Sequence, residues 1–389
     1  MRILFISRGW PSEQQPQCGN FERDQAIALS ERGHQVISLY LDVHPEFHSK
    51  KLGITREQKD GVVVYCLYAG SYWVEFVKHI SPWLQSKVVA VLFYYLVNSV
   101  IRKEGKPDLV YGHYLWFCRR ALAIKRKYGI PAVGTEHWSE MGYTNIEEGY
   151  KRLAAKTYPY LDKQLVVSDA LRENILKNIG IDTTVVYDTY GKEFYYKEHI
   201  KKDETVRFVL TGSLLPIKGF DLVIQALGEG VTLPKNLQFT IIGDGPEKEK
   251  LLGMVEEYHL SDIVHLVGSQ TRTYIANALQ EADVYILSSH LETFGVAPVE
   301  ALACGVPVIA TDCGGSRSYM NDFNGLLIPI DDVKAMSEAI SYMAEHYLEY
   351  DRKRIAEDCR QRFSSEVIGK QLESIFEDVI AKSHVSSIA

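Results

Sequence analysis

Residues 292–300 read Glu-Thr-Phe-Gly-Val-Ala-Pro-Val-Glu, and this stretch lies between two short apolar runs, 284–288 and 308–311. Each apolar run is typical of a buried strand of a parallel sheet. Pro298 suits the first position of a helix that Gly305 would end, so the sequence predicts a loop and then a helix between the two strands. Open α/β sheets bind ligands at the carboxyl edge of their strands, where such a loop lies.

Two carboxylates bracket this predicted loop: Glu292 lies within it, and Glu300 falls in the first turn of the predicted helix. The free backbone N–H groups at the start of the helix, near Phe294, Gly295 and Val296, are expected to face an oxygen-rich or anionic ligand. A glutamate in a first helical turn commonly only complements the helix dipole, so Glu300 by itself does not identify a site.

The composition is that of an ordinary globular protein, with 389 residues, 46% of them hydrophobic and 24% charged. At roughly 150 residues per domain, this length favours two domains. The net charge of −7 is shared unevenly, since residues 1–190 are slightly basic and the remainder is acidic. This fits a first half that meets an anionic surface or acceptor, although an ordinary solvated surface explains it equally well. We expect no nucleic-acid partner.

Six cysteines are scattered without a Cys-x-x-Cys pair, which favours free thiols in a reducing cytoplasm and argues against a zinc site. The chain opens on a strand-like run, residues 3–7, so we expect no signal peptide. No segment reaches the ~20 apolar residues of a membrane-spanning helix.

The first half opens with a βαβ pattern: an apolar run at 2–7, an amphipathic helix at 21–32 and a new strand after Gly33, which together predict a parallel sheet. Gly19, in the first loop, would let the backbone approach a ligand closely, but a turn glycine without a ligand explains it as well. His113 and His137 each end an apolar run, which predicts two histidines at the carboxyl edge of one sheet.

The second half opens with an apolar run that ends at Gly212, and a loop with Ser213 and Lys218 follows. Free amides and one cation in such a loop are typical of a phosphate site, although an isolated surface lysine is the default interpretation. The turn after the next strand, at Gly243, lacks the third glycine of a dinucleotide fingerprint, because Lys248 stands in its place. This disfavours a dehydrogenase.

Residues 72–106 are rich in aromatic side chains and are flanked by lysines and arginines. Fourteen uncharged residues separate Lys87 from Arg102, too few to span a bilayer. We favour a buried helix that packs on the first sheet. The alternative is an aromatic and basic surface that docks peripherally on a membrane carrying a lipid-linked acceptor.

The spacing Glu292-x7-Glu300 is followed by Ala-Leu-Ala-Cys-Gly-Val-Pro, by Gly314-Gly315 and by Asn324-Gly-Leu-Leu-Ile-Pro. This string resembles the retaining glycosyltransferases of family 4, also called group 1, and the resemblance covers nearly the whole chain. It implies the GT-B fold, in which two doubly wound Rossmann-like α/β domains face a cleft. Residues 1–190, with a last helix at about 366–389 that crosses back, would bind the acceptor. Residues 191–365 would bind the nucleotide sugar.

The resemblance also implies roles for individual residues. Glu292 would contact the donor sugar, Glu300 the ribose diol and Lys218 the diphosphate, while His137, in a Thr-x-His motif, would contact the donor near the bond that breaks. Further donor contacts are implied for Gly212, Ser213, Gly243, Gly268 and residues 294–296. Gly19 and His113 are implied for the loop that meets acceptor or diphosphate.

Three positions depart from the family pattern. The family usually has arginine where Ser213 stands, which removes a cation, and Arg317 is our candidate replacement. It usually has glutamate where Ser318 stands. Tyr187-Asp188 replaces a Pro-Asn loop, which leaves open whether the two domains touch there.

We therefore expect a retaining transfer of a sugar from a nucleotide-diphosphate sugar, with UDP favoured, to a hydroxyl of a glycan or lipid-linked acceptor. The expected setting is cell-envelope polysaccharide or glycolipid synthesis in the cytoplasm, at the inner face of the plasma membrane. No Asp-x-Asp pair is placed for a metal, so we expect no metal and no cofactor. Two alternatives stay open: a nucleotide-sugar epimerase or hydrolase on the same fold, and a catalytically silent subunit of a polysaccharide-assembly complex.

Overall fold

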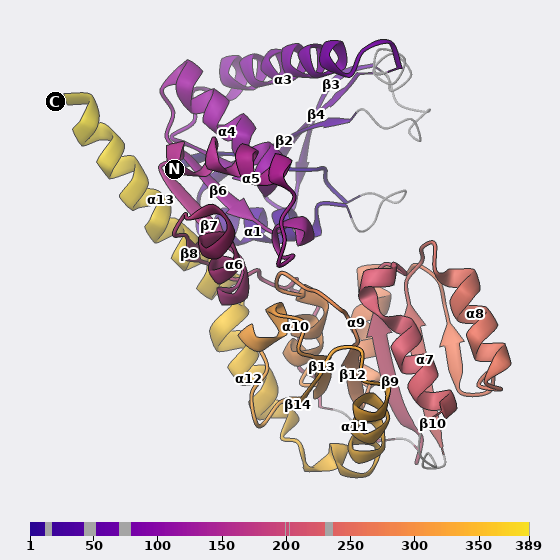
Figure 1. Cartoon of the computed structure of the whole chain (residues 1–389). Helices are drawn as coiled ribbons and strands as arrows, with labels where there is room; N and C mark the ends of the chain where they lie inside the picture. Colours follow the sequence, from indigo (N-terminus) through magenta and orange to yellow (C-terminus); the bar gives the residue numbers. More distant parts are fainter. Residues whose placement is uncertain are drawn as a thin grey trace.

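The structure is a computed structural model that describes residues 1–11, 18–42, 52–69, 79–198, 200–201, 203–229 and 236–388. These residues form two α/β domains, with a long C-terminal helix that leaves the second domain and runs back along the first (Figure 1). This is the doubly wound two-domain arrangement that the sequence predicts.

The first domain is built on a sheet of eight strands in the order β3-β4-β2-β1-β5-β6-β7-β8. All neighbouring strands are parallel except β3 and β4, which are antiparallel. Apolar runs buried on both faces form the centre of the sheet, as expected for parallel strands covered by helices. The strands are β1 (Arg2–Ile6), β2 (Gln35–Asp42), β3 (Gly53–Lys59), β4 (Val62–Tyr68), β5 (Leu109–His113), β6 (Ala132–Glu136), β7 (Lys163–Val166) and β8 (Thr184–Val185).

Helices connect these strands and cover the sheet (Figure 1). The α-helices are α1 (Asn20–Glu31), α3 (Pro82–Glu104), α4 (Tyr114–Tyr128), α5 (Glu148–Ala155) and α6 (Asp169–Ile179). Two short 3-10 helices, η1 (Ser139–Met141) and η2 (Tyr158–Tyr160), lie in the loops around α5.

The second domain has a six-stranded, all-parallel sheet in the order β11-β10-β9-β12-β13-β14. Its strands are β9 (Val206–Thr211), β10 (Leu237–Ile242), β11 (Val264–Leu266), β12 (Val284–Leu287), β13 (Val308–Thr311) and β14 (Gly325–Ile328). Its helices are α7 (Phe220–Glu229), α8 (Lys248–Glu257), α9 (Arg272–Glu281), α10 (Val296–Ala303), α11 (Val333–His346) and α12 (Arg352–Phe363), with 3-10 turns η3 (Pro216–Lys218), η4 (Gly315–Ser318) and η5 (Tyr347–Glu349).

The last helix, α13 (Ser365–Ile388), packs on the first domain. Its Ile368, Leu372 and Phe376 are fully buried in one cluster with Ile3 and Phe5 of β1. Its bounds agree with the last helix that the sequence predicts at about 366–389. By burying one face against α1 and β1, α13 ties the two domains together in addition to the chain's own linker.

Helix α3 settles only part of the question raised by residues 72–106, since 70–78 lie outside the described residues. One face of α3 is buried on the sheet, through Phe93, Leu96, Val97 and Val100. The other face leaves large apolar side chains exposed: Trp83 (69%), Val91 (68%) and Tyr95 (58%).

The count of uncharged residues between Lys87 and Arg102 underestimated the length of the apolar part of α3. Residues Trp83–Glu104 are long and apolar enough to cross a membrane by length and composition, with a mean hydropathy of 1.5 over the most apolar window. The conclusion that the segment is too short was therefore wrong. The core helix of a globular domain passes the same criterion, and α3 does pack on the sheet, so the criterion does not place it in a bilayer.

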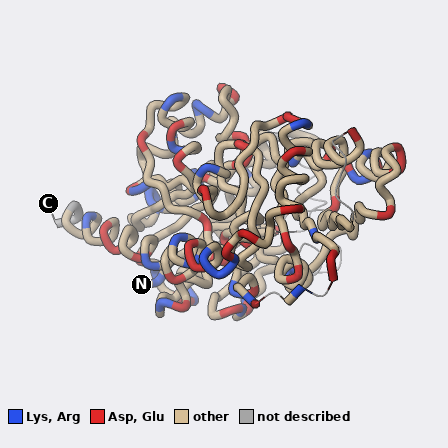
Figure 2. Tube along the Cα trace, turned by 90° about the horizontal axis from the view of Figure 1, so that it is seen from below, with Lys and Arg blue, Asp and Glu red and all other residues tan. Residues whose placement is uncertain are grey.

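Lys and Arg positions are interspersed with Asp and Glu positions along the Cα trace in Figure 2. The net charge thus says little about a binding site, and the individual side chains between the domains carry more information.

Candidate functional site

The carboxyl ends of both parallel sheets face a cavity of about 420 Å³ between the domains. This is the size range of small-molecule sites, and the edge of the sheet is where open α/β sheets bind ligands. The first domain contributes Arg8, Asn20, Phe21, Tyr114, His137, Trp138, Ser139 and Asp188. The second contributes the loops after β9, β10 and β12 and the start of α10.

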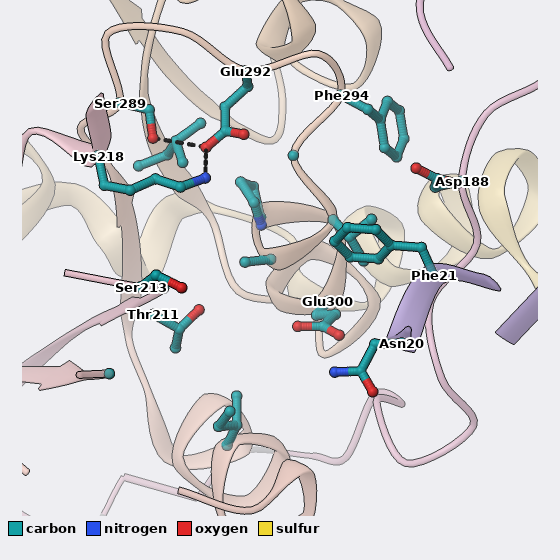
Figure 3. Close-up of a pocket in the computed structure, with 18 of the residues that line it drawn as sticks. Asn20, Phe21, Asp188, Thr211, Ser213, Lys218, Ser289, Glu292, Phe294 and Glu300 are labelled. Carbon is teal, nitrogen blue, oxygen red and sulfur yellow. Dashed lines mark hydrogen bonds and ion pairs between the residues drawn. The ribbon is translucent and has the colours of Figure 1, made fainter. Parts of the chain in front are cut away.

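Glu292 and Lys218 form an ion pair at one end of this cleft (Figure 3). The Lys218 Nζ donates to Glu292 Oε1 at 2.6 Å, and the Ser289 hydroxyl donates to the same oxygen at 2.8 Å. Lys218 ends the 3-10 turn after β9, whereas Glu292 lies in the loop after β12. The two neighbouring strands thus bring a cation and a carboxylate together from positions 74 residues apart.

The Gly314-Gly315 turn holds the Glu292 loop in place. The Glu292 amide donates to the carbonyl of Cys313 at 3.1 Å, and the Gly315 amide donates back to the carbonyl of Glu292 at 3.0 Å. A Cβ at position 315 would lie 2.6–2.7 Å from backbone atoms of Phe294, so only glycine fits here. The glycine pair therefore fixes the backbone beside the cleft, and Glu292 is the residue of this contact that lines the cavity.

Helix α10 begins at Val296, two residues earlier than predicted, after Gly295 in the left-handed region with φ 90°. Glu300 is therefore the fifth helical residue and not part of the first turn, so its position is not explained by the helix dipole. Phe294, Gly295, Val296 and Glu300 all line the cleft.

Glu300 pairs with Arg272, whose Nη2 lies 3.1 Å from Glu300 Oε1. Burial raises the pKa of the Glu300 carboxyl to about 8, because the carboxylates of Asp24 and Glu193 add to the cost of its charge and Arg272 offsets only part of it. The two glutamates of the motif thus have different surroundings: Glu292 faces a lysine, and Glu300 sits in a buried ionic cluster.

His137 is held by hydrogen bonds on both of its ring nitrogens. Its Nδ1 lies 3.2 Å from Asp188 Oδ2, and its Nε2 lies 3.0 Å from His113 Nδ1. Burial lowers the pKa of His137, but the carboxylates of Asp188, Glu22 and Glu136 together outweigh burial, so the net pKa is raised. Burial, followed by the charge of His137, lowers the pKa of His113.

The two predicted histidines therefore lie together, as their sheet positions implied, but they differ in access. His137 lines the cleft, whereas His113 is fully buried behind it and does not line it. A ring-nitrogen contact between His137 and a donor requires one of its internal hydrogen bonds to be exchanged. His137 also meets the second domain, since the Thr293 hydroxyl donates to its carbonyl at 2.8 Å.

The two domains do touch at Tyr187-Asp188, the pair that replaces the Pro-Asn loop of the family pattern. The Tyr187 ring stacks on Phe294 of the second domain, with ring centroids 5.6 Å apart. Asp188 holds His137 and also accepts from the Gln25 amide at 2.9 Å. Tyr187 thus contacts the second domain, whereas Asp188 holds residues of the first domain at the edge of the cleft.

Arg317 does not enter the cleft, so the prediction that it replaces the missing cation at Ser213 was wrong. Its guanidinium forms a two-pronged pair with Asp312, with both N–O distances 2.6 Å, and its side chain is 70% exposed. It does not line the cleft, although Ser213 does. The one-turn helix η4 directs the Arg317 side chain outward, and nothing in the local sequence indicates that direction.

Sequence analysis missed two arginines that do line the cleft, Arg8 and Arg272. Arg8 follows β1 at the carboxyl edge, where its Nε lies 3.2 Å from Glu22 Oε1 and its guanidinium lies 4.4 Å from the centre of the Tyr114 ring. Its place at the end of the first strand is the signal that could have identified it. Arg272, by contrast, begins a helix in the second domain and carries no motif.

The glycines of the predicted site divide into two groups. Gly212 and Gly243 line the cleft, and a Cβ at 243 would lie 1.8 Å from the carbonyl oxygen of Gly212. Gly19 and Gly268 do not line it. Gly19 precedes α1 with φ 72°, and a Cβ there would lie 2.3 Å from the Gly9 carbonyl oxygen, so it lets the two ends of the connection between β1 and α1 approach each other closely.

Within the described ranges, no group of three or more His, Cys, Asp or Glu side chains is placed to hold a metal ion. The expectation of metal-independent chemistry stays a prediction. The positive charges that line this cleft in the described residues are those of Arg8, Lys218 and Arg272.

Comparison with known proteins places the chain in a family. A family model described as "Glycosyl transferases group 1" matches residues 191–362, and one described as "Glycosyltransferase Family 4" matches residues 21–188. The two matches together cover most of the chain, one for each domain. They meet between residues 188 and 191, where the chain passes from the first domain to the second.

Individual relatives are more distant. A putative teichuronic acid biosynthesis glycosyltransferase of Bacillus subtilis is 26% identical over 88% of this chain and 88% of its own length. One subunit of the phosphatidylinositol N-acetylglucosaminyltransferase of Arabidopsis thaliana is 25% identical over 75% of this chain, which spans 66% of that protein. The structure of Anabaena HepE in complex with UDP and glucose is similar in fold, with a TM-score of 0.70, 18% identity and coverage of 97% of this chain and 100% of that one.

Proposed function

The chain belongs to glycosyltransferase family 4, and from this premise we propose that it transfers a sugar from a UDP-sugar to a hydroxyl of a glycan or lipid-linked acceptor, with retention at the anomeric carbon. The observation that carries the proposal is the cleft itself. It places the Lys218–Glu292 pair, the start of α10 and Glu300 around one cavity that both domains line.

The choice of UDP is supported by a protein of the same fold that was crystallised with UDP and glucose. The choice of a cell-envelope glycan or a glycolipid as acceptor is supported by the names of two relatives, one tied to teichuronic acid and one to phosphatidylinositol. The acceptor would enter from the first domain, where Phe21, Tyr114 and Trp138 offer aromatic faces to a sugar ring.

The chemistry that this cleft can support is simple. The bond between the anomeric carbon and the diphosphate oxygen breaks, and its electron pair leaves with the β-phosphate. The Lys218 ammonium and the free amides at the start of α10 stabilise the charge that develops there. The acceptor oxygen then bonds to the anomeric carbon from the same face, and its proton passes to the departing phosphate, so the original anomeric configuration is kept.

Each remaining group has a positioning role in this proposal. Glu292, fixed by Ser289 and Lys218, accepts hydrogen bonds from donor-sugar hydroxyls. Glu300 accepts the ribose hydroxyls. His137 presents a ring held by Asp188 and His113 to the reaction centre. Arg8 supplies a second cation from the acceptor side, because Ser213 carries none.

The function is tested by the thermal stability of the protein with UDP, GDP and ADP, in buffer that contains EDTA and no added metal. At a hundred times its dissociation constant, a nucleotide should stabilise the wild type by about 2.7 kcal/mol. We expect UDP to do so and Glu300→Ala to lose the effect. Stabilisation by none of the three nucleotides would contradict the transferase and favour a silent subunit.

Product analysis with UDP-sugar and acceptor separates the other alternative. A transferase turns over the donor only slowly when the acceptor is left out, whereas an epimerase or hydrolase needs no acceptor. The anomeric configuration of the product, determined by NMR, tests retention.

Nucleotide affinity is expected to depend on pH through Glu300. Its pKa is raised to about 8, so the carboxyl holds a proton at pH 7 and loses it as the pH rises. A carboxylate accepts both ribose hydroxyls, whereas the protonated acid accepts less well, so UDP should bind about tenfold more tightly at pH 9 than at pH 7. Isothermal titration calorimetry at pH 7, 8 and 9 measures how the dissociation constant of UDP changes with pH.

Glu300→Gln is the control, since it cannot ionise. The UDP phosphate itself titrates near pH 6 and contributes equally to both proteins. The same slope in the variant would assign the pH dependence to another group.

The localisation proposal concerns α3, whose exposed Trp83, Val91 and Tyr95 would contact the inner face of the plasma membrane. Lys87 beside Trp83 and Lys127 over the Tyr94 ring add cations to this surface, which anionic lipid headgroups favour. We expect Val91→Asp to reduce co-sedimentation with vesicles of anionic phospholipid. The matched control is Leu348→Asp, at a similarly exposed position (76%) of the second domain. Equal binding of both variants would remove α3 as the contact.

A further inference from the structure

Arg272 is the centre of a partly buried ionic cluster that links the two domains. Its Nη1 lies 2.9 Å from Asp24 Oδ1 of α1, its Nε lies 2.8 Å from Glu193 Oε1 of the linker, and its Nη2 lies 3.1 Å from Glu300 Oε1 of α10. One guanidinium thus joins the acceptor domain, the linker and the donor domain. The mechanism proposed above assigns it no role.

The surroundings fix Arg272 in this position. It is the first residue of α9, and the hydroxyl of the preceding Thr271 caps the helix by accepting from the Tyr274 amide at 3.2 Å. The guanidinium lies 5.2 Å from the centre of the buried Phe194 ring, a cation–π distance. At Gly191, a Cβ would lie 2.6 Å from Arg272 Nη2 and 2.5 Å from Glu193 Oε2, so the linker backbone itself packs against the cluster.

The charges of the cluster are strongly interdependent. Burial raises the pKa of Asp24 to about 6, and the nearby Arg272 and Arg23 offset only part of this rise. For Arg272 the balance is reversed: burial lowers its pKa, but the three carboxylates outweigh burial, so the net pKa is raised. The charged groups that shift the pKa of Glu300 are Arg272, Asp24 and Glu193, and the side chains of Tyr285 and Cys304 also lie within its electrostatic reach. Because Arg272 contacts three carboxylates, and Asp24 has only Arg23 as a further cation at 3.5 Å, the loss of any one partner changes the charge and position of the others.

Only part of this cluster can touch a ligand. Arg272 and Glu300 line the cleft, whereas Asp24 and Glu193 do not. The guanidinium occupies Glu300 Oε1 and leaves the other carboxylate oxygen for a ligand. Asp24, with its side chain 4% exposed, is reached only through Arg272 and Arg23.

We propose that Arg272 is a positioning residue that couples nucleotide binding at Glu300 to closure of the cleft, by sharing its guanidinium between Glu300 on the donor side and Asp24 on the acceptor side. The inference rests on the proposed function, since it takes Glu300 as the ribose-binding carboxylate. When the domains close, Asp24 completes the Arg272 pair and Glu300 is held in place for the ribose. When they part, Arg272 loses Asp24, and Glu300 loses its fixed orientation.

The variant that tests this is Asp24→Asn, which keeps the shape of the side chain, removes its charge and leaves every cleft-lining residue unchanged. Because apparent affinity falls with the fraction of protein in the binding-competent state, we expect UDP to bind about tenfold more weakly. Small-angle X-ray scattering of the nucleotide-free variant should show a larger radius of gyration than wild type, and UDP should reduce it. The matched control is Asp182→Asn, which removes an exposed ion pair with Arg172 in the same domain.

A second variant separates coupling from a general loss of stability. If Asp24 acts through Arg272, Asp24→Asn should weaken UDP binding little or not at all in an Arg272→Met background, since the two changes then remove the same interaction. Additive effects would show independent roles and overturn the proposal. So would wild-type UDP affinity in Asp24→Asn, or a loss of affinity with unchanged scattering.

The two proposals fail in different ways. A wild type that binds neither UDP, GDP nor ADP refutes the proposed function. The scattering of nucleotide-free Asp24→Asn tests the interdomain contact without any nucleotide, and a radius of gyration equal to that of the wild type refutes the coupling alone.

Discussion

Replacing Lys218 by methionine is expected to lower the rate of sugar transfer by about two to three orders of magnitude, the effect of removing one preorganised charge from a site where negative charge develops. Lys218 is the cleft cation of the donor domain that lies against Glu292, and its Nζ is 2.6 Å from that carboxylate. Methionine keeps the length of the side chain and removes only the charge. Initial rates with UDP-sugar and acceptor measure the loss.

The distribution of the loss between kcat and KM is as informative as its size. If the ammonium acts on the departing diphosphate, kcat falls more than the affinity for donor, because the charge on the leaving oxygen grows in the transition state. Lys334→Met, at an 83% exposed position of α11, is the matched control and should leave the rate unchanged. A Lys218→Met enzyme with wild-type kcat and only a higher KM would reduce Lys218 to a binding residue.

The same variant releases Glu292 from its ion pair, which has a structural cost that must be separated from catalysis. The side chain of Glu292 is 10% exposed, and an unpaired carboxylate at this depth is unfavourable. The Ser289 hydroxyl still donates to it at 2.8 Å. We therefore expect Lys218→Met to remain folded, and its unfolding temperature is measured alongside the rates.

Local sequence pattern was sufficient to predict the parallel strands and the loop that carries Glu292, since buried parallel strands are nearly continuous apolar runs with clear ends. It also placed His113 and His137 at the same sheet edge, where they do meet. These predictions depend on the length of the apolar runs and on which residues follow their ends, and both can be read directly from the sequence.

What could not be predicted is the direction of side chains in short turns and the contacts between domains. Arg317 leaves η4 toward Asp312 rather than the cleft, because one residue more or less in a 3-10 turn rotates the side-chain direction by about 120°. Arg272 and Asp24 are 248 residues apart, and they meet only because α9 and α1 face each other between the two domains. No local signal in either segment indicates its partner.

Arg8 is a different case, because its place just after β1 is a signal in the sequence, and it leads to the second prediction. Arg8→Gln is expected to lower kcat by about a hundredfold, because the diphosphate would lose its cation from the acceptor domain. The Arg8 Nε is 3.2 Å from Glu22, while its guanidinium lies over the Tyr114 ring at the edge of the cavity. Its position in the first domain makes its contribution dependent on closure of the cleft.

A transplanted cation tests whether Arg8 acts by its charge. Ser213 is exposed and lines the same cleft from the donor domain, so an arginine side chain at this position can reach the cavity without displacing a buried group. We expect the double variant with Arg8→Gln and Ser213→Arg to have a kcat at least about tenfold higher than Arg8→Gln alone, because a cation at either position would stabilise the same diphosphate charge. Arg172→Gln, which removes an exposed arginine of the first domain, is the control.

The rescue distinguishes electrostatics from packing. If Arg8 mattered only by neutralising the buried Glu22 and covering Tyr114, an arginine introduced in the other domain would leave that defect uncorrected. Activity in the double variant would then stay at the level of Arg8→Gln, and the protein would remain less stable than wild type. Recovery of kcat without recovery of thermal stability would instead show that the cleft needs a second positive charge at the diphosphate and accepts it from either domain.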